Sequence, residues 1–211
     1  MRTLLLLALA TSVTLDTARA QSTLDFPDYR PKRDNLAKVA DPAIKHDLIF
    51  FTLAGLDQRV GQPQAASLPI TASGGDYITF GQGQLTVTIK STSFVQGKRK
   101  MNYIDKHLVR IDNKPYFGNY GLVPTEAIFS VTLIDGKDTV QVPATAFSDL
   151  YEPEFTYTDG GVVKSHDGVY LSADKQTIYI YMLNKEVNGY YEVTWVIRNH
   201  KYLSRVVDTQ I

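Results

Sequence analysis

The side chains best suited to bind a cation form an acidic cluster in the second half of the chain. Asp149, Glu152 and Glu154 flank Tyr151, and carboxylate oxygens are the hard ligands that Ca²⁺ prefers. Their spacing does not match an EF-hand loop, so a solvated acidic loop is the alternative. Two of these carboxylates would also suit a glycosidase if they lay about 5–5.5 Å apart for retention, or about 6.5–9.5 Å for inversion. The cluster therefore suggests a calcium site or a small carbohydrate-active enzyme.

A second candidate site is the aromatic and glycine-rich segment 115–121, where a polar connection would be expected. Exposed rings, together with the donor and acceptor of an asparagine amide, would hold a sugar ring or a partner's side chain. In the alternative interpretation, Tyr116 and Phe117 begin a strand and pack into the core. The candidate ligand-binding residues are Tyr116, Phe117, Asn119, Tyr120 and Tyr151.

The remaining sequence patterns give weaker indications of a functional site. The four histidines have no histidine or cysteine partner at metal-ligand spacing, and neither H-E-x-x-H nor G-x-S-x-G occurs. We therefore expect no cofactor and no metal besides the calcium candidate. Lys98, Arg99 and Lys100, with Lys106 nearby, form a basic knuckle: a charged loop that keeps an edge soluble, or a contact for an anionic partner. Residues 177–183 alternate tyrosines with aliphatic residues, and the tyrosine face is a second candidate platform if it is exposed.

The first twenty residues have the three parts of a secretory signal peptide. Arg2 precedes an apolar run from Leu4 to Leu15, and Ala18 and Ala20 are the small residues that a signal peptidase reads. The run is too short to cross roughly 30 Å of hydrocarbon. We expect cleavage after Ala20 and export to the periplasm or the exterior of a bacterial cell. No cysteine follows, which excludes disulfides and an N-terminal lipid anchor on cysteine.

The composition of the remaining chain excludes several function classes. Removing Arg2, Arg19 and Asp16 from the 22 basic and 22 acidic residues leaves a net charge of −1. A nucleic-acid binder usually carries a basic excess, so we expect no nucleic-acid partner. No second apolar stretch is long enough for a membrane helix. Thirteen tyrosines and nine phenylalanines are typical of a chain built from strands.

The hydropathy pattern predicts the elements that position these residues. From Tyr77 onwards, about nine to eleven short alternating runs are separated by turn residues, with no long helical pattern. This pattern predicts a mostly β fold, an antiparallel β-sandwich of jelly-roll or Ig-like type, with a barrel as the alternative. We expect a signal peptide over 1–20, an extended N-terminal arm over 21–45 and a single sandwich domain over 46–211. Residues 48–54 are predicted as a buried strand, with a helix capped by Asp41 as the rival.

The last hairpin can be predicted in register. If Asn199 and His200 form a two-residue loop, Arg198 lies opposite Lys201 and Thr194 lies opposite Arg205. Trp195 is then expected as a core anchor on the opposite face from Arg205. These patterns favour an exported, non-enzymatic module that binds a glycan or an envelope protein. A carbohydrate-active enzyme and a structural or assembly subunit are the alternatives.

Overall fold

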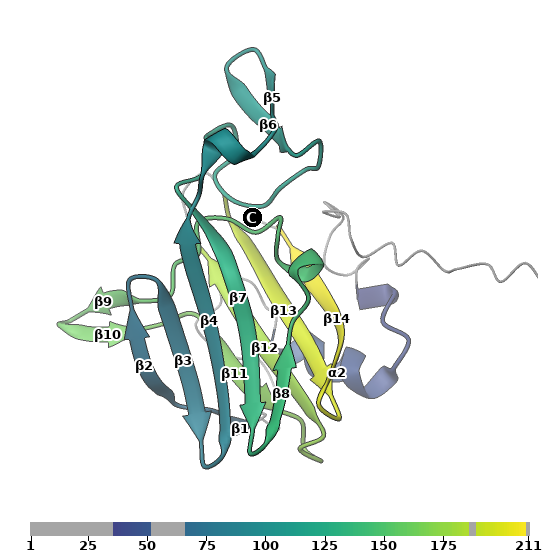
Figure 1. The fold of residues 1–211 in the computed structure, drawn as a ribbon. Helices are drawn as coiled ribbons and strands as arrows, with labels where there is room; N and C mark the ends of the chain where they lie inside the picture. The colour runs from purple at the N-terminus through teal and green to yellow at the C-terminus, as the bar shows by residue number, and fades with distance from the viewer. Residues whose placement is uncertain (1–35, 52–65, 186–188, 210–211) are drawn as a thin grey trace, which may run out of the picture.

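The chain folds into two five-stranded antiparallel sheets that pack against each other as a sandwich (Figure 1). The computed structural model describes residues 36–51, 66–185 and 189–209. Among these residues neither large sheet closes on itself. The prediction of a mostly β, antiparallel sandwich is confirmed, and the barrel alternative is not. The signal segment 1–20 and most of the predicted arm lie outside the described residues.

The first large sheet has the strand order β1-β11-β12-β13-β14 and the second has the order β2-β3-β4-β7-β8. The strands of the first sheet are β1 (Ala66–Ser67), β11 (Gly168–Leu171), β12 (Thr177–Asn184), β13 (Tyr191–Arg198) and β14 (Lys201–Asp208). The strands of the second sheet are β2 (Ile70–Gly74), β3 (Tyr77–Gln82), β4 (Leu85–Ser93), β7 (Glu126–Asp135) and β8 (Asp138–Gln141).

Two small hairpins stand outside the sandwich (Figure 1). They comprise β5 (Met101–Ile104) with β6 (His107–Ile111), and β9 (Tyr157–Asp159) with β10 (Val162–Lys164). Short 3₁₀ turns, η2 (Gln96–Lys98) and η3 (Ala144–Ala146), precede β5 and follow β8.

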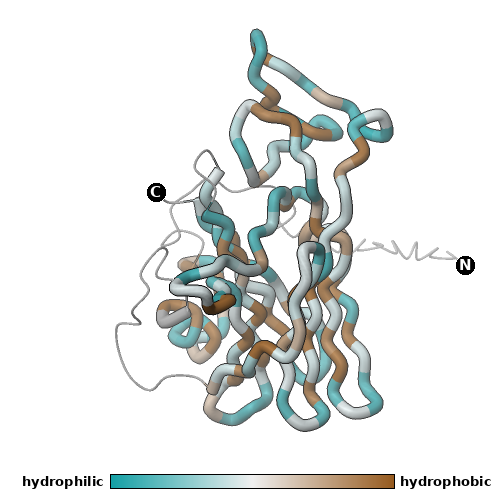
Figure 2. Tube along the Cα trace, turned by 90° about the vertical axis from the view of Figure 1, so that its left-hand side faces the viewer, coloured by the Kyte–Doolittle hydropathy of each residue, from teal (hydrophilic) through white to brown (hydrophobic). Residues whose placement is uncertain are grey.

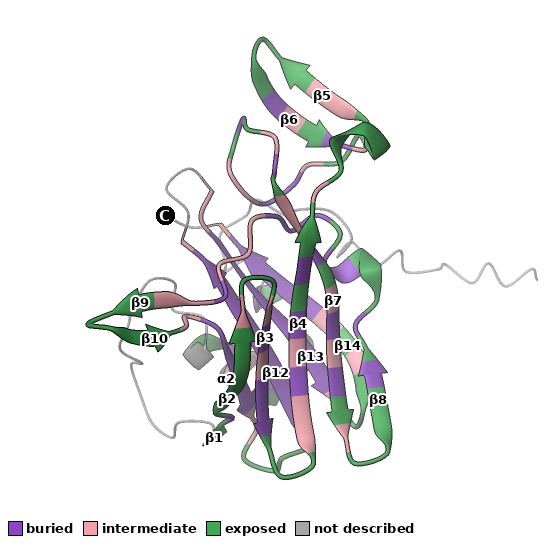
Figure 3. Ribbon diagram, turned by 60° about the vertical axis from the view of Figure 1, so that its left-hand side comes forward, coloured by how far each residue is buried: buried purple, intermediate pink, exposed green. Residues whose placement is uncertain are grey.

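The core lies between the two sheets and is formed by the alternating apolar positions of both. Val87 and Ile89 of β4 are fully buried, while Lys90 is exposed, as the alternation predicts. Trp195 is also fully buried and donates its indole Nε1–H to the carbonyl of Ala146, 2.8 Å away. The expected role of Trp195 as a core anchor is confirmed. Strands β12 and β13 are buried along almost their whole length (Figure 3), so their outer face must be covered as well.

A helix covers part of that outer face, and it corrects the predicted strand. Helix α2 (Pro42–Phe51) includes residues 48–51, and residues 42–45, which we expected in an extended arm, are helical too. Asp41 caps it, because its Oδ1 accepts hydrogen bonds from the N–H groups of Ala43 (2.9 Å) and Ile44 (3.2 Å). Leu48 packs with Ile44 against the outer face of the sheet. Residues 52–54 of the predicted strand lie outside the described residues.

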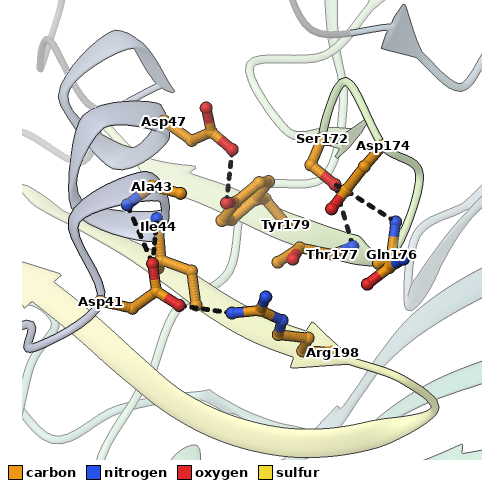
Figure 4. A network of polar contacts seen from close by, with 10 residues as sticks. All are labelled: Asp41, Ala43, Ile44, Asp47, Ser172, Asp174, Gln176, Thr177, Tyr179 and Arg198. Carbon is orange, nitrogen blue, oxygen red and sulfur yellow. Dashed lines mark hydrogen bonds and ion pairs between the residues drawn. The ribbon is translucent and has the colours of Figure 1, made fainter.

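Two side chains of the sheet also bond to this helical segment (Figure 4). Tyr179 donates its hydroxyl to Asp47, 2.6 Å away, and Arg198 pairs with the second oxygen of Asp41. The short apolar run alone does not reveal these contacts. Helix and strand were both compatible with it, and tertiary packing on the sheet decides between them.

The last hairpin confirms its predicted loop and corrects its predicted register. Arg198 lies opposite Lys201, and the two loop residues have the positive φ angles of a type I′ turn. The pairing then shifts by one residue, because Ile197 pairs with Tyr202 whereas Val196 pairs with Ser204. Leu203 is therefore the extra residue of a β-bulge in β14.

Beyond the bulge every side chain of β14 changes face relative to the prediction. Arg205 lies opposite Trp195 instead of Thr194, and Val206 lies opposite Thr194. The bulge thus places Arg205 on the face that carries the sandwich core.

Candidate functional site

The predicted aromatic site is mostly core. Tyr116, Phe117 and Tyr151 are buried, and Asn119 is half-buried, which leaves Tyr120 as the exposed ring of the five candidates. Three of the five candidates therefore cannot present a ring to a ligand. Tyr116 and Phe117 pack into the core, as the alternative interpretation has it, but they do not begin a strand, since Phe117 forms only an isolated bridge to Leu150.

Tyr116 and Tyr151 belong to a separate small core at one end of the sandwich, whereas Phe117 packs in the main core between the sheets. Tyr116 and Phe94 each meet the ring of Tyr151 edge to face, with centroids 5.8 Å and 5.4 Å away. The Tyr116 hydroxyl lies 3.2 Å from the carbonyl of Leu108 and 3.2 Å from that of Asn119, so it ties the loop to β6. Burial raises the pKa of Tyr151 to about 12, and this phenol stays neutral.

Two carboxylates of the acidic cluster, those of Asp149 and Glu152, make structural contacts. Both oxygens of Asp149 bind the guanidinium group of Arg205, at 2.6 Å and 2.7 Å. The Glu152 carboxylate accepts from the backbone N–H and the hydroxyl of Thr125, at 2.5 Å and 3.0 Å. Burial, with the charge of Glu154 as a smaller contribution, raises the pKa of the Asp167 carboxyl. Across the described ranges, no three His, Cys, Asp or Glu side chains converge as metal ligands, so the calcium expectation for Asp149, Glu152 and Glu154 is not met there.

The partner of Asp149 could not be found from the sequence. Arg205 and Asp149 are both buried, and Arg205 also donates to the carbonyl of Ala146, 3.1 Å away. Ala146 thus accepts from Arg205 and from Trp195. The alternating pattern of β14 placed Arg205 on the solvent face, and only the bulge at Leu203 turns it inwards.

The second predicted platform, the tyrosine face of β12, is also buried. Tyr179 bonds to Asp47 of α2, and Tyr181 donates its hydroxyl to Glu192, 2.8 Å away. Burial, with the Glu192 charge beside it, raises the pKa of Tyr181. The condition for a platform there, exposure to solvent, is not met.

The four histidines do not come together. His200 lies 2.9 Å from Asp135 and 3.5 Å from Asp138, at the turn between β7 and β8. His166 stacks on Tyr157, and His107 stacks on Tyr120, with ring centroids 4.2 Å and 6.4 Å apart. His46 lies on α2.

One part of the chain combines exposed apolar and basic side chains. Residues 94–123, which we call the basic lobe, comprise η2, the hairpin β5–β6 and the loop that carries Tyr120. The lobe projects beyond one end of the sandwich (Figure 1) and is mostly exposed on its outer parts (Figure 3). The small core around Tyr116 and Tyr151 joins it to the sandwich.

Exposed apolar residues of the basic lobe lie at the tip of the hairpin and in the Tyr120 loop. Tyr103 and Ile104 end β5 directly before the turn, and they are 47% and 64% exposed. Tyr120 and Leu122 are 68% and 54% exposed. Tyr120 belongs beside the tip because its ring stacks on His107, the first residue after the turn. Brown apolar segments in the lobe are visible in Figure 2.

Gly121 allows the Tyr120 loop to lie close to His107. Gly121 has a φ of +81°, and a Cβ atom there would lie 2.8 Å from Nδ1 of His107. Only glycine combines that backbone angle with so close an approach to a ring. Gly121 therefore holds the Tyr120 loop against β6, to which it is also paired through Leu108.

The basic lobe carries a strong positive charge in a chain that is otherwise acidic. Its charged residues are the cations Lys98, Arg99, Lys100, Lys106, Arg110 and Lys114 and the anions Asp105 and Asp112. Six cations against two anions give the lobe a net charge of +4, whereas the other residues from 21 to 211 hold 14 cations and 19 anions, a net charge of −5.

Most of this positive charge is not neutralised within the fold. Arg99 pairs with Asp112 at 2.7 Å. Although partial burial acts against it, hydrogen bonds from the Lys100 N–H and from Arg99 lower the pKa of Asp112. Lys98, Lys100 and the remaining lobe cations form no ion pair with any residue that the structure describes.

No protein-family model, curated protein or solved structure matches this chain. No helix within the described ranges has the length and hydropathy to span a membrane.

Proposed function

We propose that this chain is an exported, non-enzymatic binding module that attaches to an anionic partner through the basic lobe. The observation that carries the proposal is the separation of charge, with +4 on the lobe and −5 on the rest of residues 21–211. A local potential of this kind attracts anionic ligands even when the whole molecule is nearly neutral.

Several features support a binding role over catalysis. Two of the three carboxylates considered for a glycosidase are held in structural contacts, since Asp149 is buried against Arg205 and Glu152 bonds to Thr125. A general acid or nucleophile needs access to its substrate. Tyr120 and the half-buried Asn119, whose side-chain oxygen has no partner among the described residues, retain their candidate role at the edge of the basic lobe.

Export is a further part of the proposal, and it rests on the sequence of residues 1–20. Secretion with cleavage after Ala20, which removes residues 1–20, would place the basic lobe among the acidic polymers and surfaces of a cell envelope. N-terminal sequencing of the exported protein tests this, and a mature chain that still begins at Met1 would contradict it.

Binding by the basic lobe is tested by chromatography on heparin, used as a probe polyanion. The lobe variant Lys98→Gln/Lys100→Gln/Lys106→Gln is compared with the body variant Lys90→Gln/Lys137→Gln/Lys201→Gln. All six lysines are exposed, so both variants lose three charges without losing packing.

We expect the wild type and the body variant to be retained and to elute at similar salt concentrations. The lobe variant should elute much earlier, because electrostatic binding to a polyanion weakens with each cation removed. Equal elution of the two variants, or a wild type that passes through unretained at low salt, would refute the role of the lobe.

A further inference from the structure

We infer that the anionic partner of the basic lobe is the surface of a lipid bilayer, on which the lobe docks with the tip of the β5–β6 hairpin. This inference rests on the proposed function, and it adds the class of partner and the way in which the lobe contacts it. It combines two observations on the same projection, an exposed apolar tip and unpaired cations around it.

The apolar tip is the part that a soluble polyanion does not explain. Tyr103 and Ile104 are the last residues of β5, and as neighbours in a strand they extend to opposite sides of the hairpin. Exposed side chains on both sides of a projecting tip can enter a soft medium together, whereas a flat rigid partner would contact one side. Tyrosine suits the boundary between headgroups and acyl chains, because its ring is apolar and its hydroxyl is polar.

The cations lie where they would meet lipid headgroups. Lys106 is in the turn itself, Arg110 lies across from Asn102, and Lys98 and Lys100 precede β5. All four are exposed. Lysine and arginine side chains near an anionic leaflet each strengthen binding about fivefold, at about 1 kcal/mol per residue. The long stems of these side chains also cover apolar surface while their charged ends remain in water.

The backbone of the hairpin limits how deep the tip can go. Strand β5 pairs with β6 alone among the described strands, so its outer edge keeps unpaired N–H and C=O groups. Unpaired backbone groups are too costly in the hydrocarbon core. The tip therefore belongs at headgroup depth, about 5–10 Å into the boundary region, as a peripheral contact.

The other projecting hairpin provides a contrast within the same chain. Val162 and Val163 of β10 are 58% and 60% exposed, which is comparable with the tip of the basic lobe. The charged residues of this hairpin, Asp159 and Lys164, pair with each other at 2.6 Å. It thus exposes apolar surface without a net charge and serves as a matched control.

The test is co-sedimentation of the purified protein with vesicles of phosphatidylcholine alone or of phosphatidylcholine mixed with phosphatidylglycerol. The tip variant Tyr103→Ser/Ile104→Ser removes the apolar contact and keeps every charge. The control variant Val162→Ser/Val163→Ser removes a similar area from the β9–β10 hairpin. Heparin retention is measured on each protein in parallel, and circular dichroism verifies folding.

We expect the wild type and the control variant to bind the phosphatidylglycerol vesicles and not those of phosphatidylcholine alone. The tip variant should bind at least about tenfold more weakly, because the apolar side chains no longer leave water. The lobe variant, with three lysines removed, should bind roughly a hundredfold more weakly. Heparin retention of the tip variant should equal that of the wild type.

A wild type that binds heparin but not the phosphatidylglycerol vesicles would overturn the lipid inference and leave the proposed function standing, with an acidic glycan or protein as the partner. Vesicle binding that is unaffected in the tip variant would also overturn it, because charge alone would then account for the binding. A wild type that binds neither the vesicles nor heparin would reject the proposed function itself.

Discussion

Replacing Asp149 with asparagine would leave the guanidinium group of Arg205 buried without a negative partner. Arg205 is 4% exposed and Asp149 is 7% exposed, and the two charge-assisted hydrogen bonds between them measure 2.6 Å and 2.7 Å. Removing one member of such a buried pair costs about 3–5 kcal/mol. The carbonyl of Ala146 remains as a neutral acceptor, and it cannot compensate the charge.

Urea unfolding, followed by tryptophan fluorescence, measures this effect. Trp195 is the single tryptophan and lies directly opposite Arg205, so its emission reports on this part of the core. We expect the free energy of unfolding of Asp149→Asn to fall by about 3–5 kcal/mol, which corresponds to a Tm lower by roughly 6–20 °C.

The exposed pair of Asp159 and Lys164 provides the control for this measurement, with an N–O distance that is also 2.6 Å. Asp159→Asn should cost no more than about 1 kcal/mol, because a solvated pair contributes little. If Asp149→Asn were as mild as Asp159→Asn, then Arg205 would not be buried as described, and the bulge at Leu203 that turns it inwards would be in doubt.

Two further predictions concern pH and the small core. Burial, together with the nearby Glu154, raises the pKa of Asp167 although the Leu183 N–H lowers it. Above the unfolded value of 3.8 the unfolded state therefore loses its proton first. As the pH rises above that value, the stability of the wild type should thus fall relative to that of Asp167→Asn, by up to about 1.4 kcal/mol per pH unit, until the raised pKa is reached. Urea unfolding at several pH values measures this difference. Parallel pH profiles of the two proteins would contradict the prediction. In the small core, Tyr116→Ala should destabilise the fold by about 3–5 kcal/mol, whereas Tyr120→Ala should cost no more than about 0.5 kcal/mol. Thermal unfolding compares the two variants, and equal Tm values would show that Tyr116 is not a core residue.

The strands and turns could be predicted from local sequence because they depend on local chemistry. The turn at Asn199 and His200 needs residues that tolerate positive φ angles, and these residue types can be read directly. The bulge at Leu203 brings Arg205 to Asp149, a residue distant in the sequence, so the local pattern of β14 does not predict it. An alternating pattern cannot show that its own register is interrupted.

The candidate site also combines features that local sequence predicts with features that depend on distant contacts. The basic knuckle of Lys98, Arg99 and Lys100 can be read from residue types alone, but residue types do not show that Tyr120 is the exposed ring of segment 115–121. Tyr116 and Phe117 were equally aromatic, but their burial depends on the packing of segment 115–121 against Tyr151.

Tyr103 and Ile104 were missed because they belong to an ordinary strand pattern. Their exposure follows only from the position of the β5–β6 hairpin beyond the end of the sandwich (Figure 1). The sequence offered the basic residues next to them as the one available signal.

Hydrogen–deuterium exchange with and without heparin shows directly whether residues 94–123 form the binding surface. We expect slower amide exchange within the basic lobe, at the η2 turn and the β5–β6 hairpin, and unchanged exchange in β8 and in the β9–β10 hairpin. In the variant Lys98→Gln/Lys100→Gln/Lys106→Gln this protection should disappear. Protection confined to the sandwich or to α2, with the basic lobe unaffected, would show that the lobe is not the binding surface.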